Sequence, residues 1–351
     1  MSLNSLRAQI DSLDKRLIEL LNRRAGVSSM ISRLKRSGGK SLYSPDRESE
    51  VLRRIAALNK GPLSVKALEA VYSEIMSYSL SLGAGLKVAY LGPEASFSNL
   101  AALKRFGSQV TYLSCQSITD VFLQVQRDAA DYGVVPIENS IEGAVSHTMD
   151  MFNESDLKIC SQLMLDISHN LLSNCPRNKI RRIYSIPQVF GQCRIWLQQN
   201  LPDVDKIEVS STTRAAEIVS KEKCSASISS MLAAKVYKLN VAAASIEDSP
   251  HNITRFLVIG KTEAAPTGND RTSIMFSIKD KVGALHDMLL PFRKYGVNLT
   301  RIESRPSKRK AWDYYFFVDL CGHKEEKNVG KALAALENKC KFMKVLGSYP
   351  V

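Results

Sequence analysis

The N-terminal segment carries an apolar repeat that constrains the fold more than any other feature of the chain. Its apolar side chains recur in alternating steps of four and three residues, at Leu6, Ile10, Leu13, Leu17, Leu20, Val27, Ile31 and Leu34. This spacing is typical of a helix with a heptad seam. It predicts one helix over residues 4–36, about 45 Å long at 1.5 Å per residue. Because that length exceeds the usual helix of a globular domain, the seam predicts packing against a second chain.

One position of the seam is occupied by a cation. Arg24 stands where the next apolar residue is expected, and no acidic residue lies at positions 20, 21, 27 or 28 to pair with it on the helix. A buried guanidinium without a partner is costly. The residues alone therefore favour a side chain that reaches solvent at a helix boundary.

Composition narrows the class of protein. Of the 351 residues, 44% are hydrophobic and 24% charged, as in ordinary globular proteins, and no apolar run approaches the roughly 20 residues of a membrane helix. The N-terminus lacks the apolar core of a signal peptide. Seven cysteines, an odd number without a C-x-x-C pair, predict neither a zinc site nor a disulfide framework. A reducing cytoplasm fits this pattern best.

The net charge of +13 is unevenly distributed. Residues 1–85 carry +6, residues 86–265 carry zero and residues 266–351 carry +7. The basic clusters are short and have no interleaved aromatic residues, whereas phosphate-backbone binding needs a broad basic face. We therefore expect no nucleic-acid partner, while anionic small molecules remain compatible with the charge.

The periodicity divides the chain into three segments. Two further helices follow the first, one opened by Pro45 and one capped by Ser64, so residues 1–85 are predicted to be all helix. From residue 86, short apolar strands alternate with helices, as in an α/β domain. Hydroxyl residues follow several strand ends as candidate helix caps, namely Ser96, Ser98, Ser140, Thr212 and Ser230. Such caps gather unpaired N–H groups in one crevice, which favours a small anionic ligand.

A linker and a third pattern complete the chain. Residues 261–271 have linker composition, and the remaining residues alternate in the order strand, helix, strand, strand, helix, strand. This order is ferredoxin-like.

Three sets of motifs together resemble one family. They are LR…LD…LLNRR…LK…PDRE in the first segment, YLGPEASFS, VVPIENSIEGAV, HNLLS, SIPQ…QC and NITRFLV in the second, and GALH and ESRP in the third. This order is similar to that of bifunctional chorismate mutase–prephenate dehydratases with a C-terminal ACT domain. The resemblance implies a multidomain protein. Its parts are an all-α intertwined mutase domain (1–85), a two-lobed α/β dehydratase domain similar to periplasmic-binding proteins (86–262), and an α+β ferredoxin-like ACT regulatory domain (271–351).

The resemblance gives the seam arginine a role. In family mutases, the residue at Arg24 binds a substrate carboxylate, the one at Lys35 reaches the ether oxygen, and the one at Arg7 comes from the partner subunit. Arg47, Glu48 and Ser79 also match mutase site residues, with Lys35 and Glu48 expected to be catalytic. Two positions depart from the family. Gly83 stands where family mutases have Gln or Glu, and Ser44 stands where some members have Asp. Because chorismate rearranges in one pericyclic step, cations and hydrogen-bond donors suffice, and no metal or cofactor is implied.

The second segment matches the residues of a dehydratase site. The threonine of the T-R-F motif, here Thr254, is expected to be the catalytic hydroxyl, although the residues alone favour an ordinary strand position. Substrate-binding roles are implied for Ser96, Asn139, Ser140, Asn170, Ser185, Gln192 and Arg255. Two assignments stay open. Arg255 could instead make a structural ion pair, and Glu138 would have to be neutral or paired beside a dianion. Ala95, Ile141 and Ile186 replace residues that are frequent in the family.

The third segment implies control by the end product. The segments that bind phenylalanine in relatives match Gly283, Ala284, Leu285, Glu303, Ser304, Arg305 and Pro306, although Val282 replaces a frequent proline. The resemblance thus implies phenylalanine biosynthesis with chorismate and prephenate as substrates, phenylalanine as effector, no membrane partner, and a homodimer or higher homo-oligomer. Two alternatives remain: a dehydratase whose helical segment serves for dimerisation with a weak or inactive mutase, and a non-enzymatic sensor of aromatic ligands.

Overall fold

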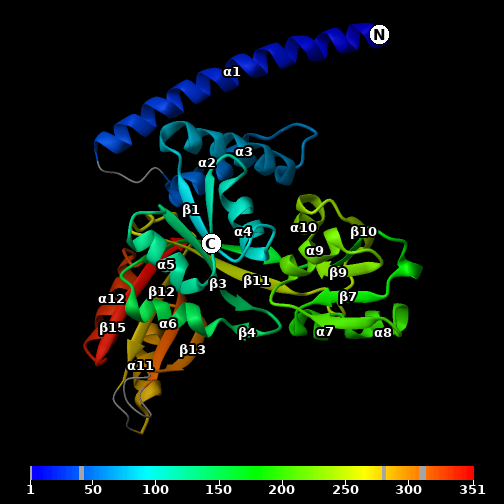
Figure 1. Ribbon diagram of the computed structural model, residues 1–351. Coiled ribbons are helices and arrows are strands. Elements are labelled where there is room, and N and C mark those ends of the chain that lie inside the picture. The colour runs from blue at the N-terminus through cyan, green and yellow to red at the C-terminus, as the bar shows by residue number, and fades with distance from the viewer. Residues whose placement is uncertain (1, 39–42, 279–281, 308–313) are drawn as a thin grey trace. The chain divides into compact units, whose positions relative to one another are not determined.

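The computed structural model describes residues 2–38, 43–278, 282–307 and 314–351, and it divides into two compact units (Figure 1). The first unit comprises residues 1–87 and 105–111, and the second comprises residues 88–104 and 112–351. Residues 39–40 and 308–310, which complete two of the short basic clusters in the sequence, lie outside the described residues.

The described part of residues 1–87 in the first unit contains the helices α1 (Leu3–Ser37), α2 (Pro45–Leu58) and α3 (Val65–Ala84). The predicted long helix is confirmed, and α1 packs against α3. All eight apolar residues of the heptad seam are exposed, by 42% to 72% of their surface. A single copy of the chain therefore leaves this apolar stripe uncovered in the first unit. No described helix is long and apolar enough to span a bilayer.

The second unit contains two lobes and a C-terminal domain. The first lobe has a mixed sheet in which the strands follow the order β2-β1-β3-β11-β5, with β4 paired to β3. Strand β11 is antiparallel to both of its neighbours, β3 and β5. The strands are β1 (Lys87–Leu91), β2 (Thr111–Cys115), β3 (Tyr132–Asn139), β4 (Gly143–Ala144), β5 (Lys158–Asp166) and β11 (Ile253–Gly260). The helices of this lobe are α4 (Phe97–Phe106), α5 (Ile118–Gln126) and α6 (Ser146–Glu154).

The second lobe has a five-stranded sheet in the order β10-β6-β9-β7-β8. Its strands are β6 (Asn170–Ser173), β7 (Arg182–Ser185), β8 (Asp205–Glu208), β9 (Ser225–Ser229) and β10 (Asn240–Ala243). Its helices are η1 (Arg177–Lys179), α7 (Pro187–Gln192), α8 (Arg194–Asn200), α9 (Thr212–Lys221) and α10 (Met231–Val236). The chain passes between the lobes twice, at residues 167–169 and 244–252, which confirms the predicted two-lobed α/β fold.

The predicted helix caps are partly confirmed. Ser96 and Ser230 accept backbone N–H groups in the first turns of α4 and α10. For α9 the cap is Ser211 rather than Thr212. The prediction that Ser140 begins a helix is wrong, because β3 turns at residues 140–142 into β4. The cause is Asn139, whose side-chain oxygen accepts the backbone N–H groups two and three residues later and so forms a turn.

The C-terminal domain has the predicted ferredoxin-like order of elements. Its sheet runs β13-β14-β12-β15, and all adjacent strands are antiparallel. The elements are β12 (Asp270–Ser277), α11 (Ala284–Lys294), β13 (Leu299–Pro306), β14 (Tyr314–Cys321), α12 (Lys327–Glu337) and β15 (Phe342–Pro350). The predicted linker is two residues shorter than expected, because β12 already begins at Asp270.

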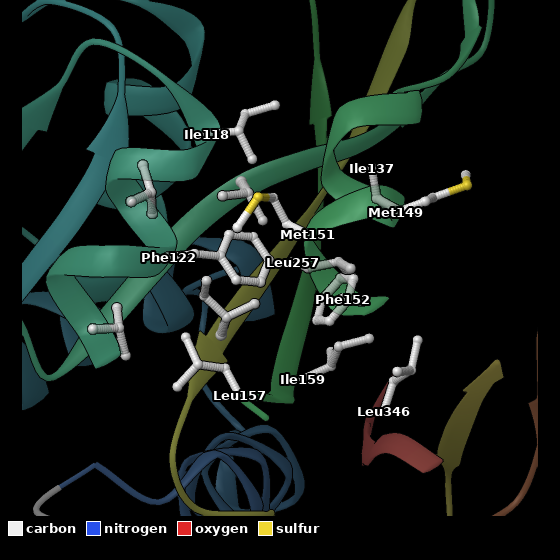
Figure 2. Packing of buried hydrophobic residues seen from close by; sticks show 14 of the residues in the cluster. Ile118, Phe122, Ile137, Met149, Met151, Phe152, Leu157, Ile159, Leu257 and Leu346 are labelled. Carbon is white, nitrogen blue, oxygen red and sulfur yellow. The ribbon is translucent and has the colours of Figure 1, made fainter. Parts of the chain in front are cut away.

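The C-terminal domain packs directly on the first lobe. Figure 2 shows Phe122, Phe152 and Ile159 of the lobe in one apolar cluster with Leu346 of β15. The backbones approach closely, since a Cβ atom at Gly347 would lie 2.3 Å from the carbonyl oxygen of Ile159. A glycine is therefore needed at this point of β15. The apolar burial and the close approach hold β15 against β5.

Candidate active sites

The first candidate site surrounds Thr254, at the start of β11. Asn139, its partner in the ladder with β3, donates one amide hydrogen to the Thr254 hydroxyl oxygen and the other to Asn252 Oδ1, both at 2.7 Å. Thr254 is 8% exposed. Because Asn139 is the donor in this bond, the hydroxyl hydrogen of Thr254 is available to an acceptor, and none is found among the described residues. The site therefore presents a buried, fixed hydroxyl donor.

Gln192 extends this network to the second lobe. From the end of α7, its Oε1 accepts from Asn252 Nδ2 at 3.0 Å and from His169 Nε2 at 2.7 Å. Its own amide donates to Glu142 of the first lobe at 3.0 Å. Burial lowers the pKa of His169, so the ring is neutral near pH 7. With Gln192 Oε1 as acceptor, the proton of that ring lies on Nε2.

Sequence reasoning singled out Asn139, Gln192 and Thr254 but missed Asn252 and His169. Both missed residues lie in the HNLLS and NITRF motifs, each as the last residue of a segment that crosses between the lobes. Polar side chains that precede a buried strand at such a crossover were the available signal.

A pocket of about 540 Å³ opens beside this network. Its lining includes Gln192 and Glu142, together with Pro187 of α7 and Glu247 of the second crossover. Thr254 is not part of the lining, so the pocket meets the network at Gln192 and not at Thr254. A pocket of this size accommodates a small molecule.

Four other predicted residues support the backbone around the network. Ser140 Oγ donates to the His251 carbonyl and accepts from the Ile253 amide, so it ties the β3–β4 turn to β11. Asn170 is buried and accepts from the amide of Ser245, which links the two crossover segments. Ser185 and Ser96 donate to backbone carbonyl groups, those of Ile228 and Leu91. In this structure, these hydroxyl and amide groups fix strand ends and helix starts.

Arg255 faces away from Thr254, because successive residues of a strand point to opposite sides of the sheet. Its guanidinium lies 2.5 Å from Asp319 of β14 and donates to Tyr349 and Gln162 at 2.9 Å. The structure thus favours the second predicted role for Arg255, a structural ion pair, over substrate binding. Glu138 lies on the same side, 3.4 Å from Arg301 of β13.

The second candidate site lies in the helical unit. Arg24 donates to the Ser79 hydroxyl at 2.9 Å, and Lys35 donates to the Ser44 hydroxyl at 2.8 Å. The seam arginine therefore has a polar partner on α3, which sequence periodicity alone did not indicate. Glu48 forms an ion pair with Arg105 at 3.2 Å.

Two predicted mutase residues lie apart from this group. Arg47 is exposed and pairs with Glu50 one turn along α2. Arg7 is exposed near the start of α1, 17 residues before Arg24 and so about 25 Å along the same helix. Arg7 can complete such a site only in another copy of the chain.

Comparison with known proteins agrees with the motifs in all three segments. Models of chorismate mutase type II, prephenate dehydratase and the ACT domain match residues 6–83, 88–264 and 272–338. The bifunctional chorismate mutase/prephenate dehydratase of Aquifex aeolicus is 48% identical over 99% of this chain and 98% of its own length. That of Stutzerimonas stutzeri is 45% identical over 99% of this chain and 97% of its own. The chain belongs to the bifunctional chorismate mutase/prephenate dehydratase family.

A solved structure extends the comparison to the fold. Prephenate dehydratase from Arthrobacter aurescens in complex with L-Phe has a TM-score of 0.71 and 33% identity, and the match covers 76% of this chain and 90% of that one. The predicted family and the predicted combination of helical, two-lobed and ACT folds are thereby confirmed.

The residues that are predicted to bind the effector lie on two elements of the ACT domain. Gly283, with φ of 76°, precedes α11 and is followed by buried Ala284 and partly exposed Leu285. Glu303, Ser304, Arg305 and Pro306 belong to β13, an edge strand of the sheet. A pocket of about 250 Å³ beside β13 is lined by Arg305, Pro306 and, from α6 of the first lobe, Asp150. Arg305 lies 3.4 Å from Asp150 across it.

Proposed function

We propose that the chain rearranges chorismate to prephenate in its helical unit and converts prephenate to phenylpyruvate in its two-lobed domain. The observation that carries the second step is the Thr254 hydroxyl, which accepts from Asn139 and keeps its own hydrogen for an acceptor. The family of bifunctional enzymes to which the chain belongs supports both steps and their place in phenylalanine biosynthesis.

The dehydratase reaction needs help for a poor leaving group. The bond to the ring carboxylate breaks and its electron pair enters the ring, while the ring oxygen leaves with its own pair and takes up a proton. Carbon dioxide and water depart, and phenylpyruvate remains. Thr254 donates a hydrogen bond to the departing oxygen and stabilises the charge that develops there, and solvent supplies the proton that completes the water molecule. Asn139 fixes the hydroxyl in this direction, and the buried setting limits hydration of the carboxylate that leaves.

The mutase reaction needs only a shaped, cationic site. Chorismate is a dianion, and its rearrangement moves negative charge onto the breaking ether oxygen. Arg24 and Lys35 are the cations that bind the carboxylates and this oxygen, and Ser79 holds the Arg24 guanidinium. Arg47 and Ser79 contribute further contacts to the substrate. Arg7 is contributed by a second copy of the chain.

The exposed heptad stripe of α1 supports a homodimer. An uncovered apolar row on a long helix is the surface that two helices bury against each other. Light scattering after size exclusion should give twice the chain mass. A monomeric mass at micromolar concentration would contradict the proposal. A cytoplasmic location fits the seven cysteines, all of which are free and lie in the described part of the chain.

A direct assay tests both activities. Pure protein is mixed with chorismate or with prephenate, and phenylpyruvate is followed by its absorbance. Product from both substrates is expected. Product from prephenate alone would indicate that the helical unit serves only for dimerisation. Product from neither substrate would indicate a non-enzymatic sensor of aromatic ligands.

Phenylalanine is proposed as the effector of the ACT domain. The complex of the Arthrobacter aurescens enzyme with L-Phe supports this assignment. Gly283 permits close approach of backbone N–H groups to the carboxylate of an amino acid, and residues 303–306 supply polar and cationic groups. Calorimetry should detect binding, and phenylalanine should depress dehydratase turnover. No binding at millimolar phenylalanine would contradict the assignment.

A further inference from the structure

Arg105 lies at the end of α4, in the segment 105–111 that groups with the helices of the first unit. Its guanidinium is 3.2 Å from the carboxylate of Glu48, and the two side chains are only 17% and 14% exposed. The ring of Tyr43 lies against the same guanidinium, with 5.5 Å between its centroid and the guanidinium carbon. None of the motifs in the sequence pointed to Arg105.

The protected setting distinguishes this pair from an ordinary surface salt bridge. The Arg47–Glu50 pair lies on α2, the helix that carries Glu48, and both of its side chains are 58% exposed. Ion pairs that are this exposed contribute little to stability. Arg105 and Glu48 are largely withdrawn from water, so the loss of one partner leaves the other charge poorly compensated. Burial lowers the pKa of Arg105, but Glu48 and Tyr43 outweigh that effect and the pKa is raised. Arg105 is therefore a permanent cation.

Glu48 presents an electrostatic problem in the proposed mutase site. It is the one acidic residue of the proposed set, and the substrate is a dianion. A carboxylate can accept a hydrogen bond from the ring hydroxyl of chorismate, but it also repels the two substrate carboxylates. A fixed cation 3.2 Å from the carboxylate removes much of that repulsion and holds the carboxylate in one orientation.

We infer that Arg105 is a positioning residue of the mutase reaction, which acts by neutralising and orienting Glu48. The inference rests on the proposed mutase function of the helical unit. It assigns a part of that site to a residue that follows β1 in the chain, outside the three helices.

Other contacts hold the segment 105–111 in place without Arg105. Ser108 donates to Glu74 at 2.8 Å, and the Gln109 amide donates to the Ser77 hydroxyl at 3.1 Å. The Thr111 amide also donates to the Leu86 carbonyl at 3.0 Å. A substitution at Arg105 should therefore leave the segment attached and affect the charge beside Glu48.

The first test compares three variants in the full-length protein. Arg105→Gln should lower kcat/KM for chorismate about tenfold or more, mainly through kcat, as expected for loss of a hydrogen bond to a charged group. Arg105→Lys keeps the charge and should restore activity to within about threefold of wild type. Ser108→Ala removes a contact of the same segment and should change chorismate turnover less than about twofold. Turnover of prephenate added directly should be unchanged in all three, which controls for folding.

A double-mutant cycle shows whether Arg105 acts through Glu48. Glu48→Gln alone should lower mutase activity, and adding Arg105→Gln to it should cost less than about twofold more. Unchanged or raised activity in Arg105→Gln, full additivity with Glu48→Gln, failure of Arg105→Lys to restore turnover, or an equal loss in Ser108→Ala would each overturn the inference. A wild-type protein without any mutase activity would instead overturn the proposed function.

Discussion

The two candidate sites are built from different chemical groups, and the two proposed reactions make different demands on them. Around Thr254, neutral amide and hydroxyl groups from strand ends and crossovers join in one network of hydrogen bonds of 2.7 to 3.0 Å. In the helical unit, the groups are cations, of which Arg24 and Lys35 donate to hydroxyl groups, on a helix whose apolar stripe is exposed. A reaction that expels a leaving group needs a fixed donor in a protected place, which one chain supplies. A reaction that folds a dianion needs surrounding cations, and here one of them is expected from a second copy.

The largest effect should follow the loss of the Thr254 hydroxyl. Thr254→Ala should lower dehydratase turnover by about 10² or more, within the range for a positioned proton-transfer group. Steady-state rates with prephenate measure this. Mutase activity should hardly change, because the proposed mutase residues belong to the helical unit.

Thr254→Ser is the matched control, because it keeps the hydroxyl and removes a methyl group. It should retain most of the turnover. A loss of only a few-fold in Thr254→Ala would reject the central role of the hydroxyl, and an equal loss of mutase activity would remove the distinction between the two sites.

The next effect concerns the helical site. Gly83 falls in the last turn of α3, where family mutases carry Gln or Glu to bond the ether oxygen. Glycine supplies no donor, and a hydrogen bond next to developing charge is worth about 3 kcal/mol, or about 10² in rate. The wild-type mutase should therefore be weak, and Gly83→Gln should raise chorismate turnover by up to about 10². Dehydratase turnover is the internal control. A wild-type rate typical of the family, with no gain in the variant, would show that Gly83 does not limit the site.

The two regions also differ in what the sequence could predict. The repeat of α1 and the alternation of the ACT strands follow from periodicity, and the structure has them within a few residues of the predicted bounds. The contacts of individual side chains were harder to predict from the sequence. Asn139 bonds its own turn and forms a hairpin where a helix was predicted after Ser140. The side of the sheet on which Arg255 lies depends on strand register, and its partner Asp319 is 64 residues away.

Contacts between distant segments account for the rest of what was missed. His169 and Asn252 meet through Gln192, and Arg105 meets Glu48, in each case across more than 20 residues of chain. A single sequence gives residue types and spacing, but tertiary packing alone brings such pairs together. The resemblance to a family predicted a catalytic role for Thr254, whereas the residues alone favoured an ordinary strand position.

The two units also differ in how closely other atoms pack around a glycine, at Gly347 on β15 and at Gly26 on α1. At Gly347 an added Cβ would lie 2.3 Å from the Ile159 carbonyl oxygen, and backbone atoms cannot move away cheaply. Gly347→Ala should therefore destabilise the unit that contains it by about 1–3 kcal/mol or more. At Gly26 on α1 nothing lies within 4 Å of the added atom. The same substitution there should stabilise the helix by about 0.5–1 kcal/mol.

Differential scanning calorimetry of both variants measures this contrast. Melting temperatures should shift in opposite directions, by a few degrees or less for Gly26→Ala. If Gly347→Ala melts like wild type, the strands β15 and β5 are less closely packed than the structure has them.

The smallest effect is expected at Ala95, where the family usually has glycine. Ala95 has φ of 67°, a left-handed conformation that costs an L-residue about 1–2 kcal/mol. Its amide donates to Asn99 and its carbonyl accepts from Ser230, so the turn is fixed at both ends. Its methyl group is buried, and this burial contributes about 0.8 kcal/mol to the stability of the fold. In Ala95→Gly the relief of strain should therefore nearly offset the lost burial and the added chain entropy, and stability should stay within about 1 kcal/mol of wild type.

The control for this last variant is Ala216→Gly, which removes an equally buried methyl group from the same apolar cluster, in the regular helix α9. No strain is relieved there, and glycine weakens a helix interior by about 1 kcal/mol. Chemical denaturation should therefore find Ala216→Gly less stable than Ala95→Gly by about 1–2 kcal/mol. Equal losses of stability in the two variants would contradict this expectation. They would mean that Ala95, found where the family usually has glycine, causes no backbone strain at the start of α4.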